Sequence, residues 1–438
     1  MGSVASANET RLDSAVFGDK AASNEGSSGH HIGALTGVRA FAALWVFLFH
    51  SWLNAGSPLL RGPQFVGALG LTPLVTFGWL GLDVFFVLSG FLLTRQALLK
   101  VGLPRTGGVE KSWSATFGET YGAYLRRRIL RVYPAYYACL TALLILAATG
   151  VYMHLPGKLE LLLHLGMVHN FIEKYIATMN GVFWTMPFEW QFYLVFPLLF
   201  VVLRRYGGWT LYGLAILAVV VAKAVVMATS NGYPQVLLPI RLDEFAAGMC
   251  AGAFAIARPL RRTMASITFW TGLAMLLATP WVFAGYSQVG HYYDLKGFLR
   301  PPWIQLGICL MLVGLTGERH AGVTIFDNKV AVGLGLISYS VYLVHVPILE
   351  LLPTMGFVPQ RTGNVSVSWA HILAAALPIV IIVSTLSYWC IERPFQQGGK
   401  KGSTRKSASP RALFPTPALY VLVLLAWAVG LEAFLFMR

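Results

Sequence analysis

The stretch Gly37-Val-Arg-Ala-Phe-Ala-Ala-Leu-Trp-Val-Phe-Leu-Phe-His50 is apolar apart from one arginine and one histidine. It lies in an apolar segment, 33–53, that is long enough to cross a bilayer as a helix of about 20 residues. Arg39 and His50 share one face of that helix, because their spacing corresponds to about three turns and a rise of about 16 Å. Ionisable residues inside a membrane span are costly and are therefore candidates for function, although a lone histidine on an apolar face is more often structural. The spacing fits a long ligand with an anionic head and a reactive far end.

The composition of the whole chain indicates that lipid is its solvent. Of 438 residues, 56% are hydrophobic and 12% are charged, whereas soluble domains carry about 25% charged residues. Apolar runs of spanning length recur along the chain, which predicts an all-α polytopic membrane protein with about ten core helices and one extra C-terminal helix. Besides 33–53, the expected spans are 73–94, 130–152, 182–203, 210–229, 237–257, 266–286, 300–317, 331–353, 369–391 and 413–436.

The basic residues predict which side of the membrane each loop faces. Most of the 33 Lys and Arg residues fall in alternate loops once the N-terminus is placed in the cytoplasm, as the positive-inside rule requires. This topology and contacts with membrane lipids explain the net charge of +15 without a nucleic-acid partner. We therefore expect a multi-pass protein of a cell membrane, the inner or plasma membrane of a bacterium. The sequence specifies no oligomeric state.

The composition also divides the chain into four parts. Residues 1–32 are polar and rich in Ser, Gly and Ala, which is typical of a disordered tail, here cytoplasmic. A membrane domain is expected at 33–396, a cytoplasmic linker at 397–412 and the extra helix at 413–438. The 4 cysteines are scattered without a CxxC motif, so neither a metal centre nor a disulfide framework is expected.

A carboxylate in the fourth expected span is a candidate partner for His50. Glu189 is expected at a similar depth in the membrane, so two helices can bring the pair together. A carboxylate beside an imidazole orients the ring and stabilises its cation, which suits a general base. The alternative is a buried pair that only locks two helices.

Arginines gather at the expected cytoplasmic boundary. Arg95 ends the second span, and Arg128 and Arg131 are three residues apart, so they share a helix face next to the third span. Guanidinium groups in this position bind phosphates through bidentate hydrogen bonds. A run of basic residues is also a topology signal, so this prediction depends on the other motifs.

Further polar residues are candidates for supporting the site or lining an acceptor pocket: Asp83, Trp184, Tyr193, Arg241, Tyr339 and His345. In the ninth span, Ser338, Tyr342 and His345 share a helix face. They either line a polar channel or satisfy one another. The Ser89-Gly90 pair that follows Asp83 is also explained by close helix packing alone.

Taken in order, these segments resemble the acyltransferase-3 family of integral membrane O-acyltransferases over roughly residues 33–396. The motifs that carry the resemblance are Arg39-x10-His50, Gly81-Leu-Asp-Val-Phe-Phe-Val-Leu-Ser-Gly-Phe, the basic run ending Arg131-Val-Tyr-Pro, Trp184 to Tyr193, Arg241-Leu-Asp-Glu-Phe, Ser338-Tyr-Ser-Val-Tyr-Leu-Val-His and Glu392-Arg-Pro-Phe.

The resemblance implies a reaction. Family members move an acyl group, often acetyl, from cytoplasmic acyl-coenzyme A to a hydroxyl. The acceptor is commonly an envelope or secreted glycan beyond the membrane, and in some members a small natural product such as a macrolide. The essential helix-1 arginine and histidine of the family correspond to Arg39 and His50. The family usually has Glu-Glu-Gln-Phe-Tyr where this chain has Phe188-Glu189-Trp-Gln-Phe-Tyr, so one carboxylate of the pair is absent.

The expected mechanism uses acyl-coenzyme A as a co-substrate and no permanently bound cofactor. Its pantetheine arm lies beside the first span, and its thioester lies near His50, the general base, with Glu189 as the orienting carboxylate. A covalent acyl-histidine intermediate is a lesser alternative. Asp83 and Tyr339 are expected to support the site. The arginines expected to hold the coenzyme A phosphates are Arg39, Arg95, Arg128 and Arg131.

The competing class is transport. Buried ionisable residues in a many-helix bundle are also typical of proton-coupled carriers and of flippases for lipid-linked glycans. A carrier moves its substrate unchanged, whereas an acyltransferase releases free coenzyme A. A membrane scaffold without activity leaves the buried charges unexplained.

Overall fold

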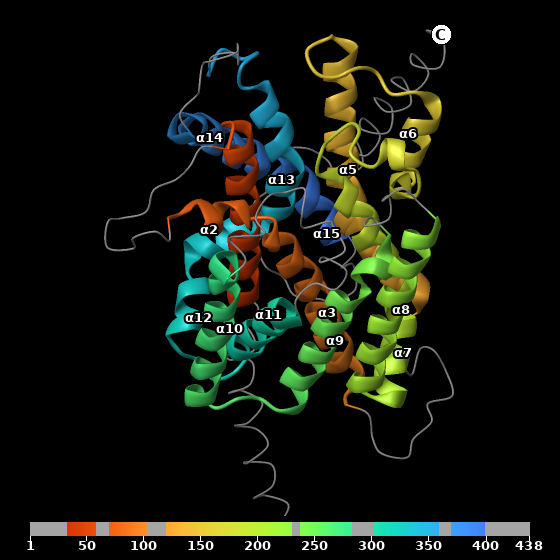
Figure 1. The fold of residues 1–438 in the computed structure, drawn as a ribbon, viewed down its shortest axis with the longest axis vertical. Helices are drawn as coiled ribbons and strands as arrows, with labels where there is room; N and C mark the ends of the chain where they lie inside the picture. Colours follow the sequence, from red (N-terminus) through yellow and green to blue (C-terminus); the bar gives the residue numbers. More distant parts are fainter. Residues whose placement is uncertain are drawn as a thin grey trace, which may run out of the picture.

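The chain folds as a bundle of helices in the computed structural model, which describes residues 33–57, 70–103, 120–229, 237–282, 302–358 and 369–398 (Figure 1). In these ranges, 8 helices are long and apolar enough to cross a membrane. The predicted all-α polytopic fold is thereby confirmed. The tail 1–32, the extra helix expected at 413–436 and nearly all of the linker lie outside the described residues.

The helices long enough to span are the first helix (Gly33–Asn54), α3 (Leu80–Val101), α5 (Tyr121–Ala148), α7 (Met186–Tyr206, preceded by the short η4, Phe183–Thr185), α8 (Gly208–Thr229), α10 (Arg262–Val282), α13 (Lys329–Leu351) and α14 (Trp369–Ser387). The chain continues from α14 through a π-helical turn, η9 (Tyr388–Glu392), into α15 (Arg393–Gly398). Shorter elements are α2 (Thr72–Thr76), α6 (Lys158–Leu165), η2 (His169–Phe171), η3 (Glu173–Tyr175), η5 (Leu238–Arg241), α9 (Leu242–Ala257), α11 (Pro302–Leu315) and α12 (Ala321–Phe326).

Two spans begin elsewhere than the apolar pattern predicts. The second, expected at 73–94, is divided into α2, a turn and α3, which continues to Val101. The third, expected from 130, begins at Tyr121, where the Thr120 side chain caps the helix by accepting a hydrogen bond from the Ala123 N–H. The basic run therefore lies inside α5. Because the first turns of this helix are charged, the apolar pattern alone places its start too late.

Glycines allow α3 and α9 to pack closely in the middle of the bundle. A Cβ atom at Gly90 would collide with the Phe245 carbonyl oxygen, and one at Gly248 would collide with the Val87 carbonyl oxygen. The same holds for the first helix, where Gly81 of α3 packs on the Ala42 carbonyl and Gly335 of α13 packs on the Thr36 carbonyl. Small residues at such crossings let helix backbones approach each other within a membrane. The first helix is thereby fixed between α3 and α13.

Prolines inside α7 and α13 leave carbonyl groups that neighbouring helices satisfy. Pro197 has no N–H for the Tyr193 carbonyl, which instead accepts a hydrogen bond from the Tyr124 hydroxyl at 3.1 Å. Pro347 leaves the Leu343 carbonyl, which accepts from the Asn180 side-chain amide at 2.8 Å. Because an unpaired carbonyl is costly away from water, these bonds fix α5 on α7 and tie α13, near Pro347, to the segment that precedes α7.

Candidate functional site

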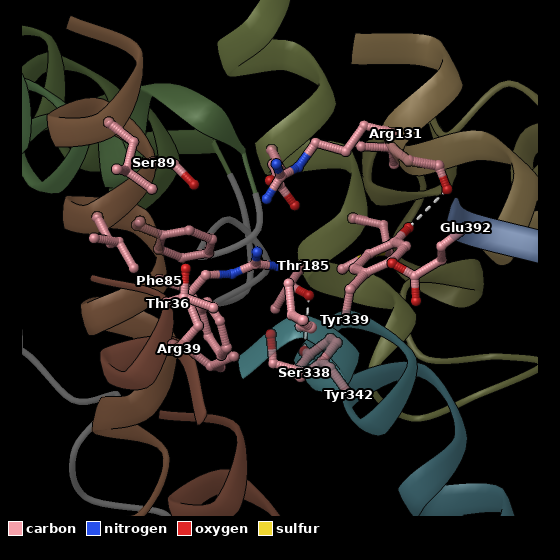
Figure 2. A pocket seen from close by; sticks show the side chains of 18 of the residues that line it. Thr36, Arg39, Phe85, Ser89, Arg131, Thr185, Ser338, Tyr339, Tyr342 and Glu392 are labelled. Atoms are coloured by element: carbon pink, nitrogen blue, oxygen red, sulfur yellow. Dashed lines mark hydrogen bonds between the residues drawn. The ribbon is translucent and has the colours of Figure 1, made fainter. Parts of the chain in front are cut away.

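A cavity of ≈ 240 Å³ lies between the first helix, α3, α5, η4, α7, α13 and the π-helical turn η9 (Figure 2). Its wall is mixed, with leucine, valine and phenylalanine side chains between polar ones. In Figure 2, Arg39 reaches toward the middle of the cavity, with Phe85 and Ser89 on one side and Tyr339 and Glu392 on the other. The polar lining residues are Thr36, Arg39, Ser89, Arg131, Thr185, Glu189, Ser338, Tyr339, Tyr342, Tyr388, Glu392 and Gln396.

Two arginines and two glutamates give this cavity a balanced charge. Arg39 interacts electrostatically with Arg131, Glu392 and Glu189. The four side chains come from the first helix, α5, η9 and α7, so the charges also join elements far apart in the sequence. An uncompensated charge in this environment costs several kcal/mol. The two arginines and the two glutamates therefore stabilise one another in the charged state.

Glu189 is held by its own helix on the cavity wall. The Tyr193 hydroxyl, one turn further along α7, donates a hydrogen bond to Glu189 Oε1. Arg128 lies over the rings of Tyr124 and Tyr193, with its guanidinium carbon 5.8 Å from each ring centroid. The predicted residues Glu189, Tyr193 and Arg128 therefore form one connected group beside the cavity.

Glu392 is a charged cavity residue that is not among the site residues predicted from the sequence. On its own, the Glu392-Arg-Pro-Phe motif fits a helix end at the membrane surface equally well. In the structure Glu392 ends the π-helical turn, where it accepts a hydrogen bond from the Ser340 hydroxyl at 2.5 Å. A π-turn widens the helix by one residue and changes the direction of its side chains. No apolar pattern predicts such a turn.

Two tyrosines of α13 close one side of the cavity. The Tyr339 hydroxyl donates to the Val132 carbonyl of α5 at 2.9 Å. The Tyr342 hydroxyl donates to the Val182 carbonyl at 3.0 Å and lies 2.8 Å from the Thr185 hydroxyl. Both tyrosines are thus held as fixed parts of the wall. As expected, Ser338 and Tyr342 lie on the same side of the helix.

Beyond Tyr342, a pair of histidines joins the first helix to α13. His345 Nε2 lies 3.2 Å from His50 Nδ1, and the ring centroids are 5.0 Å apart. His345 Nδ1 lies 2.8 Å from the Tyr342 carbonyl, and His50 Nδ1 lies 3.0 Å from the Val46 carbonyl. His345 is buried and His50 is half-buried. Because Tyr342 both lines the cavity and accepts from His345, the histidine pair lies one helical turn beyond the cavity.

The sequence predicts Glu189 beside His50, whereas the structure gives the two side chains different partners. Among the described residues, the hydrogen-bond partners of His50 are the Val46 carbonyl and His345, while Glu189 faces Tyr193 and the cavity. Equal depth along two helices does not determine which way their side chains point. The role of Glu189 in the reaction stays a prediction.

Two other predicted residues, Asp83 of α3 and Arg241 of η5, form a separate group with Glu244 of α9. Arg241 Nη1 lies 2.8 Å from Glu244 Oε1 and 3.5 Å from Asp83 Oδ1, all three being buried. Trp184 packs edge-on against Phe188 at a centroid distance of 5.8 Å. None of these residues lines the cavity.

Arg95 lies further along α3, with its guanidinium carbon 6.0 Å from the Phe91 ring centroid.

The comparison with protein families identifies the class of this fold and site. A profile described as an acyltransferase domain matches residues 32–389. The chain therefore belongs to the acyltransferase-3 family, as its motifs predict. It is an acyltransferase with several membrane-spanning helices. No solved structure matches the chain.

Of three curated relatives, two are named as acyltransferases or O-acetyltransferases, and the three differ in length. The acyltransferase MdmB of Streptomyces mycarofaciens is 26% identical over 401 residues, which cover 82% of this chain and 90% of that protein. Nodulation protein 10 of Rhizobium leguminosarum bv. viciae is 29% identical over 400 residues, covering 85% and 95%. A putative O-acetyltransferase of Staphylococcus aureus (strain COL) is 23% identical over 403 residues, covering 85% of this chain and 58% of its own length.

Proposed function

We propose that this acyltransferase transfers an acyl group, acetyl in the first instance, from acyl-coenzyme A to a hydroxyl group, with His50 as the general base. The observation that carries the proposal is the continuous site formed by the cavity and the histidine pair. Arg39 lies in the cavity, and His50, on the same helix, is joined to Tyr342 of the cavity wall through His345.

The cavity supports the donor assignment. Arg39 and Arg131 supply two guanidinium groups, the side chain best suited to binding phosphate. The rise of about 16 Å from Arg39 to His50 along the first helix is about the length of a pantetheine arm. Arg95 and Arg128 extend the basic surface toward the side that the positive-inside rule assigns to the cytoplasm. In this arrangement the donor enters from the cytoplasm and its thioester reaches His50.

In the proposed reaction His50 is the only group that takes up and returns the proton. The acceptor hydroxyl attacks the thioester carbonyl carbon while His50 Nε2 takes the hydroxyl proton. The new ester C–O bond forms, the C–S bond breaks, and the thiolate of coenzyme A takes the proton back from His50. General acid–base catalysis of this kind contributes about 10²- to 10⁴-fold to a rate.

For the acceptor we propose a carbohydrate hydroxyl on the far side of a bacterial inner or plasma membrane. Relatives named O-acetyltransferases support O-acylation, and the half-buried His50 lies toward the end of the first helix opposite Arg39. A small natural product such as a macrolide is the alternative acceptor class and belongs in the same assay.

The test is release of coenzyme A by purified protein in nanodiscs with acetyl-coenzyme A and a panel of sugar and macrolide acceptors. We expect acceptor-dependent release together with an acylated product detected by mass spectrometry. In His50→Ala we expect turnover to fall about 10³-fold, with an unchanged elution profile and melting temperature. Normal turnover in folded His50→Ala would contradict the mechanism. Movement of an intact acceptor without coenzyme A release would indicate a transporter.

A further inference from the structure

The hydrogen bonds around the histidine pair determine where its protons lie. His345 Nδ1 faces two backbone carbonyl oxygens, Tyr342 at 2.8 Å and Val341 at 3.1 Å, and a carbonyl oxygen only accepts. His345 Nδ1 therefore carries a hydrogen. In the neutral ring the other nitrogen, Nε2, then has a lone pair and accepts a hydrogen bond.

The same reasoning assigns the protons of His50. Its Nδ1 faces His345 Nε2 at 3.2 Å and the Val46 carbonyl at 3.0 Å, and both are acceptors. His50 Nδ1 therefore carries the hydrogen and shares it between them. The remaining nitrogen, Nε2, then has its lone pair available, and no described residue forms a hydrogen bond with it. That is the state a general base needs before it takes a proton.

We propose that His345 is the positioning residue of the catalytic base: it orients His50, keeps its Nε2 unprotonated and accepts a stronger hydrogen bond from Nδ1 once His50 is charged. This inference rests on the proposed function of His50. It assigns to a neutral imidazole the role that the sequence analysis gave to Glu189.

A neutral partner suits this location better than a carboxylate. His345 is 1% exposed and is surrounded by apolar and aromatic side chains, with the Phe47 ring centroid 6.4 Å from its own. A carboxylate there would carry a full charge in the membrane interior whenever His50 is neutral, at a cost of several kcal/mol. An imidazole accepts the same hydrogen bond without that charge.

The surroundings add no competing charge to the pair. Among the described residues, the titratable group that meets the pair from its own helix is Tyr342, whose hydroxyl is turned away toward Thr185 and Val182. The first helix contributes the Phe49 ring, 5.1 Å from the His50 ring. The electrostatic partner of His345 is His50 itself. The groups that can accept a hydrogen bond from charged His50 are therefore the Val46 carbonyl and His345 Nε2, and of these two only His345 is a side chain that mutation can change.

Backbone groups of α13 near Pro347 hold His345 in this position. Pro347 leaves the Leu343 carbonyl for Asn180, so the turn between residues 343 and 347 is tied to the segment before α7. One turn earlier, the carbonyl oxygens of Val341 and Tyr342 accept hydrogen bonds from His345 Nδ1. The orientation of His345 thus comes from backbone groups that mutation of a neighbouring side chain leaves intact.

Three substitutions of His345 separate positioning from packing. His345→Gln keeps an acceptor at the far end of a side chain of similar reach, His345→Asn is too short to reach His50, and His345→Phe keeps a ring without an acceptor. Val346→Ala, which removes buried methyl groups in the same turn, is the matched packing control. Each protein is assayed as the full chain in nanodiscs, with kcat, KM for acetyl-coenzyme A and the pH profile of kcat.

We expect kcat to fall about 100-fold in His345→Phe and His345→Asn, with the donor KM within about twofold because the cavity is unchanged. In His345→Gln we expect kcat within about tenfold of the native enzyme. The acidic limb of the profile should move to lower pH in His345→Phe and His345→Asn, since charged His50 has lost its acceptor. Val346→Ala should retain the native profile.

Equal losses in the Gln, Asn and Phe variants with an unshifted pH profile would overturn the proposal and leave His345 a packing residue. If His345→Phe fails to fold, the Gln and Asn pair decides alone. An active native enzyme whose His345 variants keep full kcat refutes this inference only. A native enzyme that releases no coenzyme A with any acceptor refutes the proposed function and this inference with it.

Discussion

The part of the chain that the structure describes contains two histidine pairs that differ in geometry. His50 and His345 meet nitrogen to nitrogen between two long helices, with one ring half-buried. His164 of α6 and His169 of η2 stack face to face in the connection between α5 and α7, with centroids 4.0 Å apart and an angle of 19° between the ring planes. Both rings of the second pair are completely buried.

The hydrogen bonds show how the two pairs differ in what they can do. Both nitrogens of His164 have partners, the Tyr136 hydroxyl at 3.3 Å and the Thr178 hydroxyl at 3.1 Å. His169 Nε2 donates to the Phe183 carbonyl at 3.1 Å. No ring of this pair lines the cavity, and its three hydrogen-bonded nitrogens stabilise the fold. His169 Nδ1 also has no hydrogen-bond partner, but its ring is completely buried. His50 is half-buried and lies beside the cavity wall, so exposure, rather than an unpaired nitrogen, distinguishes the histidine that a substrate can reach.

Apart from substitution of the two histidines themselves, the largest expected effect concerns the charged cavity next to the first pair. Arg39→Met removes a phosphate-binding group and leaves Glu189 and Glu392 with less positive charge nearby. A hydrogen bond to a charged group contributes about 1.5–3 kcal/mol, so the donor KM should rise about 10- to 100-fold. The measurement is steady-state kinetics with acetyl-coenzyme A, together with the melting temperature.

The double variant Arg39→Met, Glu392→Gln separates charge balance from donor binding. Removing one carboxylate should restore part of the lost thermal stability, because fewer buried charges are uncompensated. The donor KM should stay high. A native KM in Arg39→Met would show that the cavity does not hold the donor phosphates.

These differences also show what the sequence could and could not predict. The apolar spans and the ordered motifs predicted the fold class, and they named Arg39, Arg131, Glu189 and Tyr339, all of which line the cavity. They did not predict that Glu189 points toward Tyr193, because sequence fixes depth along a helix better than direction between helices.

Two further features depend on contacts between helices. Glu392 enters the cavity through a π-turn that the apolar pattern does not encode. His345 shares a predicted helix face with Tyr342, but its partner lies 295 residues earlier in the chain, so only the folded structure reveals the pair.

The second expected effect is a pH dependence of the free energy of unfolding, caused by the stacked pair His164 and His169. Burial lowers the pKa of His169 to about 4, and burial together with the neighbouring His169 lowers the pKa of His164 to about 2. Unfolding exposes both rings, whose ordinary pKa is about 6.5, so the unfolded state binds more protons below that pH. Stability is therefore full above pH of about 6.5 and falls as the pH drops, by about 2 kcal/mol per histidine at pH 5.

The variant His169→Gln tests this linkage by removing one titrating group while keeping a donor for the Phe183 carbonyl. The decrease in unfolding free energy between pH 6.5 and pH 5 should become smaller by about 2 kcal/mol, measured by denaturant titration in micelles. His154→Gln changes an exposed histidine of the same connection and should leave the slope as it is. Identical slopes in His169→Gln and the native protein would show that the buried pair is protonated without unfolding.

The smallest expected effect is that of Tyr136→Phe, which removes one hydroxyl from the stacked pair. That hydroxyl donates to the His164 carbonyl at 3.0 Å and lies 3.3 Å from His164 Nδ1. Its loss should lower the free energy of unfolding by about 1 kcal/mol, the usual contribution of one hydrogen bond. The turnover per folded molecule should stay unchanged, because His164 faces neither the cavity nor the first pair. A loss of turnover larger than the loss of folded protein would show that the stacked pair acts on the reaction, and the distinction between the two histidine pairs would then fail.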